Sequence, residues 1–312
     1  MRTSPPVRIQ IRAPYPPSTE TEIKFDTYRY YLQCICEYLQ QEYGTWEDFG
    51  LQCIARTQKL REMRCFDKAW IDRFVKIAWN TEYLLCMGPD DPELIRISNQ
   101  WTPVQAYFSV YACSEAVAYA IDGGKADGHR KALRKVTDYF VKNGMSPWDK
   151  TFKGPLGKTK NEHEPVNFPD NLTIPHNLSR RNVDPLEMIA KCLKAEHSHR
   201  VDDLWKSRKR EGVYKYEFDP GYTGLLHFLY RLRIKSNYKE VDLFVAEAPE
   251  ENIRGFARCM QEFCCWTLLY MEIMLIRKCT KHYLLGLAEK YRSVNPHAKR
   301  LKERTDFYRV SI

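Results

Sequence analysis

Apolar side chains recur along most of this chain at the three- and four-residue spacing of amphipathic helices. Between Trp70 and Leu85 they form one stripe, which is typical of a helix that packs against a core. The same spacing predicts helices over residues 23–43, 45–63, 66–86, 129–143 and 249–291. The pattern therefore predicts an all-α fold in which the helices form a bundle.

Cap and turn signals mark where these helices begin and end. Thr102-Pro103-Val104-Gln105 has the form of a capping box with proline at the first helical position, so a further helix is predicted from there to Gly123-Gly124. Its alanines at every fourth position would let neighbouring helices approach closely. Residues 146–184 are rich in Pro, Gly, Lys and Asn and show no periodicity, which indicates an irregular insertion. A helix is predicted to begin again at Asp184-Pro185.

Composition narrows the class of protein. Of the 312 residues, 44% are hydrophobic, which is enough for a core. The 49 Lys+Arg exceed the 40 Asp+Glu, and the net charge of +9 is compatible with a nucleic-acid partner. The 11 cysteines are odd in number and irregularly spaced, so we expect reduced, mostly buried thiols in a cytoplasmic protein. Their spacing does not fit a zinc site, and we expect no metal, no other cofactor and no membrane association.

The richest group of polar side chains lies between Arg231 and Tyr238. Arg231, Lys235 and Tyr238 are spaced i, i+4 and i+7, so they share one face of a helix. Arg233 and Asn237 form a second i, i+4 pair beside them. Guanidinium groups on a rigid helix suit a phosphate, because each can donate two parallel hydrogen bonds. The same spacing also fits an ordinary amphipathic helix with a solvated basic face.

A second basic run lies between Arg200 and Arg210. It includes Lys206, Arg208 and Lys209, near the end of the helix predicted from Asp184-Pro185. Such a run can contact nucleic acid, and it can equally be a solvated helix end.

Two blocks of the chain together resemble the HEPN superfamily of small helical domains. The first is Gln105-Ala106-Tyr107-Phe108-Ser109-Val110-Tyr111-Ala112, with His129 at the start of the next helix, and it is similar to the second and third helices of that family. The second is Leu229-Tyr230-Arg231-Leu232-Arg233-Ile234-Lys235-Ser236-Asn237-Tyr238, which resembles the motif region. The resemblance covers about residues 66–145 and 220–290.

The pattern of the chain and the resemblance together predict four parts. They are an extended arm (1–21), a helical extension (22–65), an HEPN-like antiparallel bundle (66–290) with an insertion at about 146–219, and a basic tail (291–312). If the chain is an interaction module, we expect the arm and the insertion to make the protein contacts.

The resemblance implies metal-independent endoribonuclease chemistry at a cleft shared by two protomers. The family motif is an arginine, four to six residues, a histidine, and often a tyrosine two residues later. Arg231 matches the arginine and Tyr238 the tyrosine, but Ser236 occupies the position of the histidine. Arginine stabilises charge on the scissile phosphate and histidine transfers a proton, which serine cannot do without a separate base.

Two histidines are candidates for the missing base. His282 follows Arg277 at the Arg-x4-His spacing, near the end of the last predicted helix. His227 precedes Arg231 by four residues and so faces the same way. The alternative for each is structural: an exposed basic helix end for His282, and a core or rim position for His227.

These features lead to an expected function and to alternatives of other classes. We expect an RNA-directed protein of prokaryotic defence or toxin–antitoxin type, either an endoribonuclease or a degenerate RNA-binding relative, acting as a homodimer. The expected catalytic group comprises Arg231, Ser236, Tyr238, Arg277 and His282. The residues expected to bind RNA or another phosphate-bearing ligand are Arg233, Lys235, Asn237, His227, Arg208 and Arg210.

The main alternative is a non-catalytic helical interaction module or a subunit of a larger complex, which the serine in the motif favours. A nucleotide-binding module has less support, because Gly123-Gly124 lacks the Lys and Ser/Thr of a phosphate-binding loop.

Overall fold

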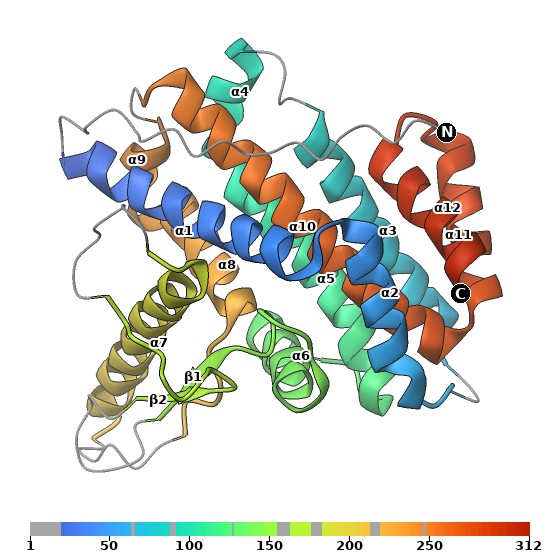
Figure 1. Cartoon of the computed structure of the whole chain (residues 1–312), viewed down its shortest axis with the longest axis horizontal. Helices are drawn as coiled ribbons and strands as arrows, with labels where there is room; N and C mark the ends of the chain where they lie inside the picture. The colour runs from blue at the N-terminus through green and yellow to red at the C-terminus, as the bar shows by residue number, and fades with distance from the viewer. Residues whose placement is uncertain are drawn as a thin grey trace.

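The computed structural model describes residues 20–63, 66–87, 92–126, 128–154, 163–175, 183–212, 219–245 and 248–312. Almost all regular structure in these ranges is helical, and two short strands form one small sheet (Figure 1). The predicted all-α class is therefore confirmed. The predicted arm over residues 1–21 lies outside the described ranges, except for its last two residues, which belong to the first helix.

Four long helices build the core. They are α1 (Glu20–Tyr43), α3 (Lys68–Cys86), α5 (Thr102–Asp122) and α10 (Glu250–Cys279). α10 runs through the middle of the molecule (Figure 1), and every one of its residues from Phe263 to Ile276 is buried. α5 packs against both α3 and α10. The predicted alanines at 112, 116 and 120 are all buried on α5, where they permit this close approach.

α10 is also long and apolar enough to cross a bilayer by length and composition. However, 89% of its most apolar window is buried inside the protein. α10 is therefore buried as a central core helix is. Its length and apolar composition alone are weak evidence for a membrane span.

Three further helices lie on one side of the core. They are α6 (His129–Asn143), α7 (Pro185–Arg210) and α8 (Leu225–Ile234). α7 packs on α1 and α8, and α6 packs on α5. Although the sequence predicted only irregular chain over 146–184, this segment contains β1 (Thr151–Lys153) and β2 (Glu164–Val166), which pair antiparallel. Phe152 of β1 also forms a bridge with Thr223, just before α8, and so ties the hairpin to the three helices.

The last predicted helix is divided in two. α10 ends at Cys279 and α11 (Lys281–Val294) follows, because Thr280 adopts a φ of 80° that a continuous helix does not allow. The Thr280 hydroxyl accepts a hydrogen bond from the Tyr283 amide and so caps α11.

The predicted basic tail is a helix, α12 (Lys299–Ser311), that packs on the rest of the fold. Its Arg304 is buried and donates to the carboxylates of Glu82 on α3 and Glu272 on α10. One ion network therefore joins three helices. The basic composition of this segment gave no indication that Arg304 is buried.

Smaller differences from the predicted elements occur at helix ends. The predicted helix over 45–63 ends early, as α2 (Trp46–Arg56) and a 3-10 turn (Thr57–Lys59). α4 (Pro92–Ser98) was not predicted. After α8 the chain makes a π-helical turn (Lys235–Lys239) and a short helix, α9 (Val241–Val245), before α10 begins. The face predicted to run from Arg231 to Tyr238 is therefore not that of one regular α-helix.

The described cysteines are free thiols, and nine of these ten are buried. Burial raises the pKa of the Cys53 and Cys113 thiols well above the ordinary value, so they are inert core side chains.

Candidate functional site

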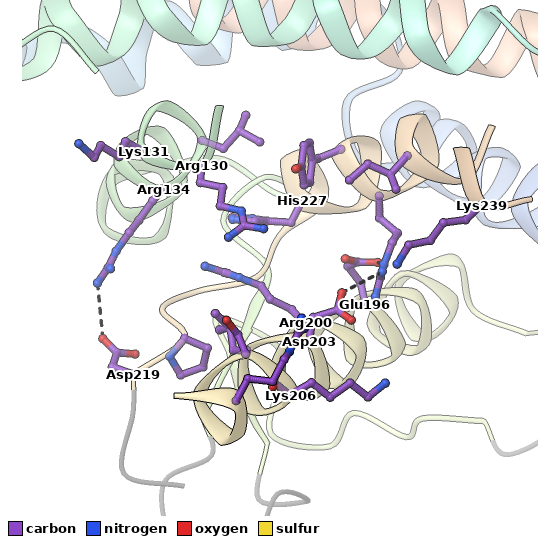
Figure 2. A pocket seen from close by; sticks show the side chains of 18 residues that line it. Arg130, Lys131, Arg134, Glu196, Arg200, Asp203, Lys206, Asp219, His227 and Lys239 are labelled. Atoms are coloured by element: carbon purple, nitrogen blue, oxygen red, sulfur yellow. Dashed lines mark hydrogen bonds and ion pairs between the residues drawn. The ribbon is translucent and has the colours of Figure 1, made fainter. Parts of the chain in front are cut away.

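A basic cavity of about 600 Å³ opens between α6, α7 and α8 (Figure 2). Eight lysine and arginine side chains line it, against three carboxylates. The cations are Arg130, Lys131, Arg134, Arg200, Lys206, Arg210, Arg231 and Lys239. A cleft whose lining carries an excess of one sign of charge attracts ligands of the opposite sign, and this volume is ordinary for a ligand site. The lining therefore favours an anion with several charges.

α6 presents its cations to the cavity because its opposite face is anchored. Ala132, Val136 and Phe140 are buried in the core. Arg130 and Arg134, spaced i, i+4, are left on the exposed side. Figure 2 shows Arg130 extending into the space between α6 and α7, whereas Arg134 reaches out to Asp219.

Arg200 on α7 is held in place by a buried network. Its Nη1 donates to the Tyr222 carbonyl at 2.7 Å and to Thr223 Oγ1 at 3.1 Å. Thr223 Oγ1 lies 2.7 Å from His197 Nδ1, and His197 Nε2 lies 3.0 Å from the Gly154 carbonyl oxygen. Because a carbonyl can only accept, Nε2 carries the proton and the Thr223 hydroxyl donates to Nδ1. Burial lowers the pKa of His197 to about 4, so the imidazole stays neutral near pH 7.

The positive charges of the cavity lining affect one another. Burial lowers the pKa of Arg200 to about 10, and the positive charges of Arg134 and Arg130 add to this effect. Arg200 is still charged near pH 7. Like charges at this proximity repel, and a bound anion would relieve the repulsion.

The predicted arginine, Arg231, also lines the cavity, but it is paired. Its Nε donates to Glu196 Oε2 at 3.2 Å, and its Nη1 to Asp203 Oδ2 at 3.3 Å. Glu196 is buried, and burial raises the pKa of its carboxyl to about 7 against the opposing effect of Arg231. The charge of this pair therefore changes near neutral pH.

The remaining residues of the predicted motif divide. Lys235 lines a smaller cavity of about 180 Å³ together with Arg231, whereas Ser236 and Tyr238 line neither cavity. Lys235 donates to the Tyr28 hydroxyl and, at 3.0 Å, to Glu240 Oε1. Ser236 is fully buried, and its hydroxyl donates to the Arg233 carbonyl at 3.1 Å. It is thus engaged inside the π-helical turn.

Arg233, Asn237 and Tyr238 are not part of the lining of the basic cavity. Asn237 is half-buried, and Tyr238 is 66% exposed. The Arg233 guanidinium packs over aromatic rings, including the ring of Tyr238 at 5.3 Å from its centroid.

The second predicted pair lies elsewhere in the molecule. Arg277, near the end of α10, donates from Nη2 to the Ile54 carbonyl of α2 at 3.3 Å. His282 is exposed at the start of α11, beyond the break at Thr280. α11 and α8 are well separated in Figure 1. The structure therefore brings neither residue to Arg231.

The other predicted phosphate ligands divide between cavity and surface. His227 lines the cavity, but burial lowers its pKa well below the ordinary value, so it is neutral near pH 7. Arg210 also lines the cavity, and its Nε donates to the Lys206 carbonyl at 3.2 Å. Arg208 is exposed and is not part of the lining.

Several residues of the site were not among the predicted ones. Arg130 and Arg134 could have been found from their i, i+4 spacing opposite an apolar face. Glu196 and His199 had no comparable signal. His199 lines the smaller cavity of about 180 Å³, which shares Glu196 and Arg231 with the larger one.

No family model, curated protein or solved structure matches the chain. What the site does must therefore be inferred from its own residues and geometry.

Proposed function

We propose that this chain is an HEPN-like, RNA-directed protein that binds phosphates of RNA in the cavity between α6, α7 and α8. The observation that carries the proposal is the lining, in which eight cations face three carboxylates around about 600 Å³. Phosphates of a nucleic acid supply the charge that such a lining lacks, and guanidinium groups bind them through paired hydrogen bonds. A role in prokaryotic defence or in a toxin–antitoxin pair is part of the proposal.

The way Arg200 is held supports a binding role. Its hydrogen bonds to Tyr222 and Thr223 fix its position before a ligand arrives, so little side-chain entropy remains to be lost on binding. Arg130 approaches the same space from α6 (Figure 2). A phosphate between these two guanidinium groups would be contacted from two helices.

The cavity supports binding more directly than cleavage. Metal-independent cleavage needs a group that transfers a proton beside the phosphate. Ser236 is buried and bonded to the Arg233 carbonyl, and the buried His227 is neutral with a strongly lowered pKa. Neither residue therefore matches the role of the motif histidine. A degenerate RNA-binding relative is therefore the favoured form of the proposal.

The test is the anisotropy of a labelled single-stranded RNA titrated with protein at low salt. Arg130→Ala and Lys206→Ala remove exposed cavity cations, and Lys302→Ala removes an exposed cation from α12 as a matched control. The parent and the control should bind alike, and each cavity variant should bind several-fold more weakly. Absence of binding by the parent, or equal losses in all three variants, would contradict the proposal.

The same samples decide between binding and cleavage. RNA incubated with the parent in EDTA should stay intact if the chain only binds. Cleavage in EDTA that is lost in Arg231→Ala would identify an endoribonuclease instead.

A non-catalytic interaction module is the second candidate, and one observation favours it. Large apolar side chains are exposed along the segment from the end of α3 to the start of α5: Leu84 (55%), Met87 (60%), Ile97 (67%) and Trp101 (49%). Exposed apolar side chains of this size are typical of protein contacts, including homodimers. Light scattering on the parent and on Ile97→Glu tests this candidate, which predicts a dimer only in the parent.

A further inference from the structure

An aromatic cluster lies next to the basic cavity. It consists of Tyr107, Phe108 and Tyr111 of α5, His129 of α6 and Tyr230 of α8. The closest pair is Tyr111 and His129, whose rings stack with centroids 3.9 Å apart. The Tyr107 ring lies 5.4 Å from that of Tyr230, and its hydroxyl lies 2.5 Å from His129 Nδ1.

The cluster and the cavity are continuous. Tyr230 belongs to both, because it also lines the cavity. His129 is followed directly by Arg130 and Lys131, which are cavity cations on the same helix. A ligand that fills the cavity would therefore contact Tyr230, one ring of the cluster.

Arg233 occupies an unusual position in this cluster. Its guanidinium lies 5.7 Å from the Tyr107 centroid, 5.3 Å from that of Phe108 and 5.3 Å from that of Tyr238. Its buried Nε has no hydrogen-bond partner within the described part of the chain. Aromatic faces rather than carboxylates thus hold this cation in place.

Tyr238 is the outermost ring of the group and is 66% exposed. Core packing explains why Tyr107 is buried. It does not explain why the exposed ring of Tyr238 packs against Arg233. Exposed aromatic rings and guanidinium planes are the surfaces on which unpaired bases stack, and every base offers such a face. In a duplex the bases are stacked on one another and their faces are covered.

We propose that Tyr230, Arg233 and Tyr238 stack an unpaired base of an RNA whose adjoining phosphates lie in the basic cavity, so that the ligand is single-stranded. This inference rests on the proposed function, because it takes phosphate binding in the cavity as given. It adds that the RNA is single-stranded. It also adds a second set of contacts, made to a base rather than to phosphates, in which Arg233 is the charged residue.

The test compares three labelled probes: a short single-stranded RNA, the duplex of the same sequence, and the single strand with abasic positions. Each is titrated with the parent, Tyr238→Ala and Tyr238→Phe. Tyr238 is exposed, so these variants should fold normally, which circular dichroism checks. The parent should bind the intact single strand most tightly. Tyr238→Ala should weaken that binding by at least about fivefold, the lower end of the effect of losing one stacked base.

Three further results complete the expected pattern. Tyr238→Phe should bind like the parent, because it keeps the ring. Tyr238→Ala should not alter binding of the abasic strand. The salt dependence should be the same for Tyr238→Ala and the parent, because no phosphate contact is lost.

The failures of the two proposals are distinguishable. Equal affinity for single strand, duplex and abasic strand, with a steep salt dependence, would overturn base stacking and leave phosphate binding intact. Unchanged binding of the intact single strand by Tyr238→Ala would also overturn stacking. If no probe binds at low salt, both proposals fail.

Discussion

The Nε of Arg231 donates to the buried carboxylate of Glu196 across 3.2 Å. The pair lines both the basic cavity and the smaller cavity beside it. Because burial raises the pKa of Glu196 to about 7, this carboxyl is an ionised partner of Arg231 only above that pH, and Asp203 is the second partner of the arginine. The charge next to Arg231, the arginine of the predicted motif, thus depends on the protonation of Glu196 on α7.

Lowering the pH from about 8 to about 6 should strengthen RNA binding. Above its pKa the Glu196 carboxylate is charged and offsets Arg231. Below it the acid is neutral, so one of the two carboxyl groups paired with this arginine no longer competes with the phosphate. Glu196→Gln should bind at about pH 8 as the parent does at about pH 6, and its affinity should vary less with pH. Anisotropy titrations across this range measure both effects.

His199 provides the control for that pH dependence. It lines the smaller cavity, and burial lowers its pKa, so it gains its charge at more acidic pH than an ordinary histidine. His199→Gln should therefore keep the pH dependence of the parent. If RNA affinity no longer varied with pH in His199→Gln but still did so in Glu196→Gln, the pH dependence would belong to His199 and not to Glu196.

Replacing Arg304 should destabilise the whole fold. Arg304→Ala would leave the buried carboxylates of Glu82 and Glu272 without their cation, which costs about 3–5 kcal/mol for a buried pair. Urea unfolding followed by circular dichroism measures the change. Arg309→Ala, which breaks exposed ion pairs on the same helix, should leave the midpoint near that of the parent. Equal midpoints for both variants would show that the network adds little.

The Thr223 hydroxyl should matter for both stability and binding. Thr223→Val leaves the buried His197 Nδ1 without a donor and removes one acceptor of Arg200, at a cost of about 1–3 kcal/mol. The variant should also bind RNA more weakly, because Arg200 is less firmly placed. Thr223→Ser keeps the hydroxyl and should behave nearly as the parent in both assays. If Thr223→Val matches Thr223→Ser, the network does not position Arg200.

Acid should destabilise the fold through His197. Its pKa is about 4 when folded and ordinary, near 6.5, when unfolded. Between these values the unfolded chain binds a proton that the folded chain does not, so stability present above about 6.5 is lost as the pH falls towards 4. Glu196, with its raised pKa, acts in the opposite direction between about 4.5 and 7.

The two contributions are separated by comparing variants. In urea unfolding over this pH range, His197→Gln should lose less stability on acidification than the parent does. A steeper loss in His197→Gln would reverse the assigned sign.

The helices that were predicted well are those with local signals. α5 begins at Thr102 as expected, with Pro103 in its first turn, and it ends at Gly123, where φ is 76°. The predicted capping box at its start is wrong, because the N-cap residue is Trp101 and the Thr102 hydroxyl donates to the Ser98 carbonyl. The break at Thr280 gave no such signal, because a threonine in a left-handed conformation depends on the packing around it. Apolar periodicity continues across it, so one long helix was predicted.

The buried ion network and the cavity lining were not predicted, because their residues are far apart in the sequence. The burial of Arg304 was not predicted, because its partner Glu82 lies 222 residues away. The cavity needs cations from three helices, and only those near Arg231 and Arg200 formed recognisable runs. The predicted pair Arg277 and His282 matched a spacing by sequence alone, and the packing of α10 and α11 places both away from the cavity.

The most decisive measurement is the salt dependence of RNA binding by the parent, by Arg130→Ala/Lys206→Ala and by the control Lys302→Ala/Arg309→Ala. Each phosphate contact in a single strand contributes about 0.7 to the slope of log affinity against log salt concentration. If RNA phosphates occupy the cavity, the first double variant should bind more weakly and lose about 1.4 from that slope, while the control keeps the slope of the parent. Equal slopes for all three proteins would contradict the assignment of the cavity as the RNA site.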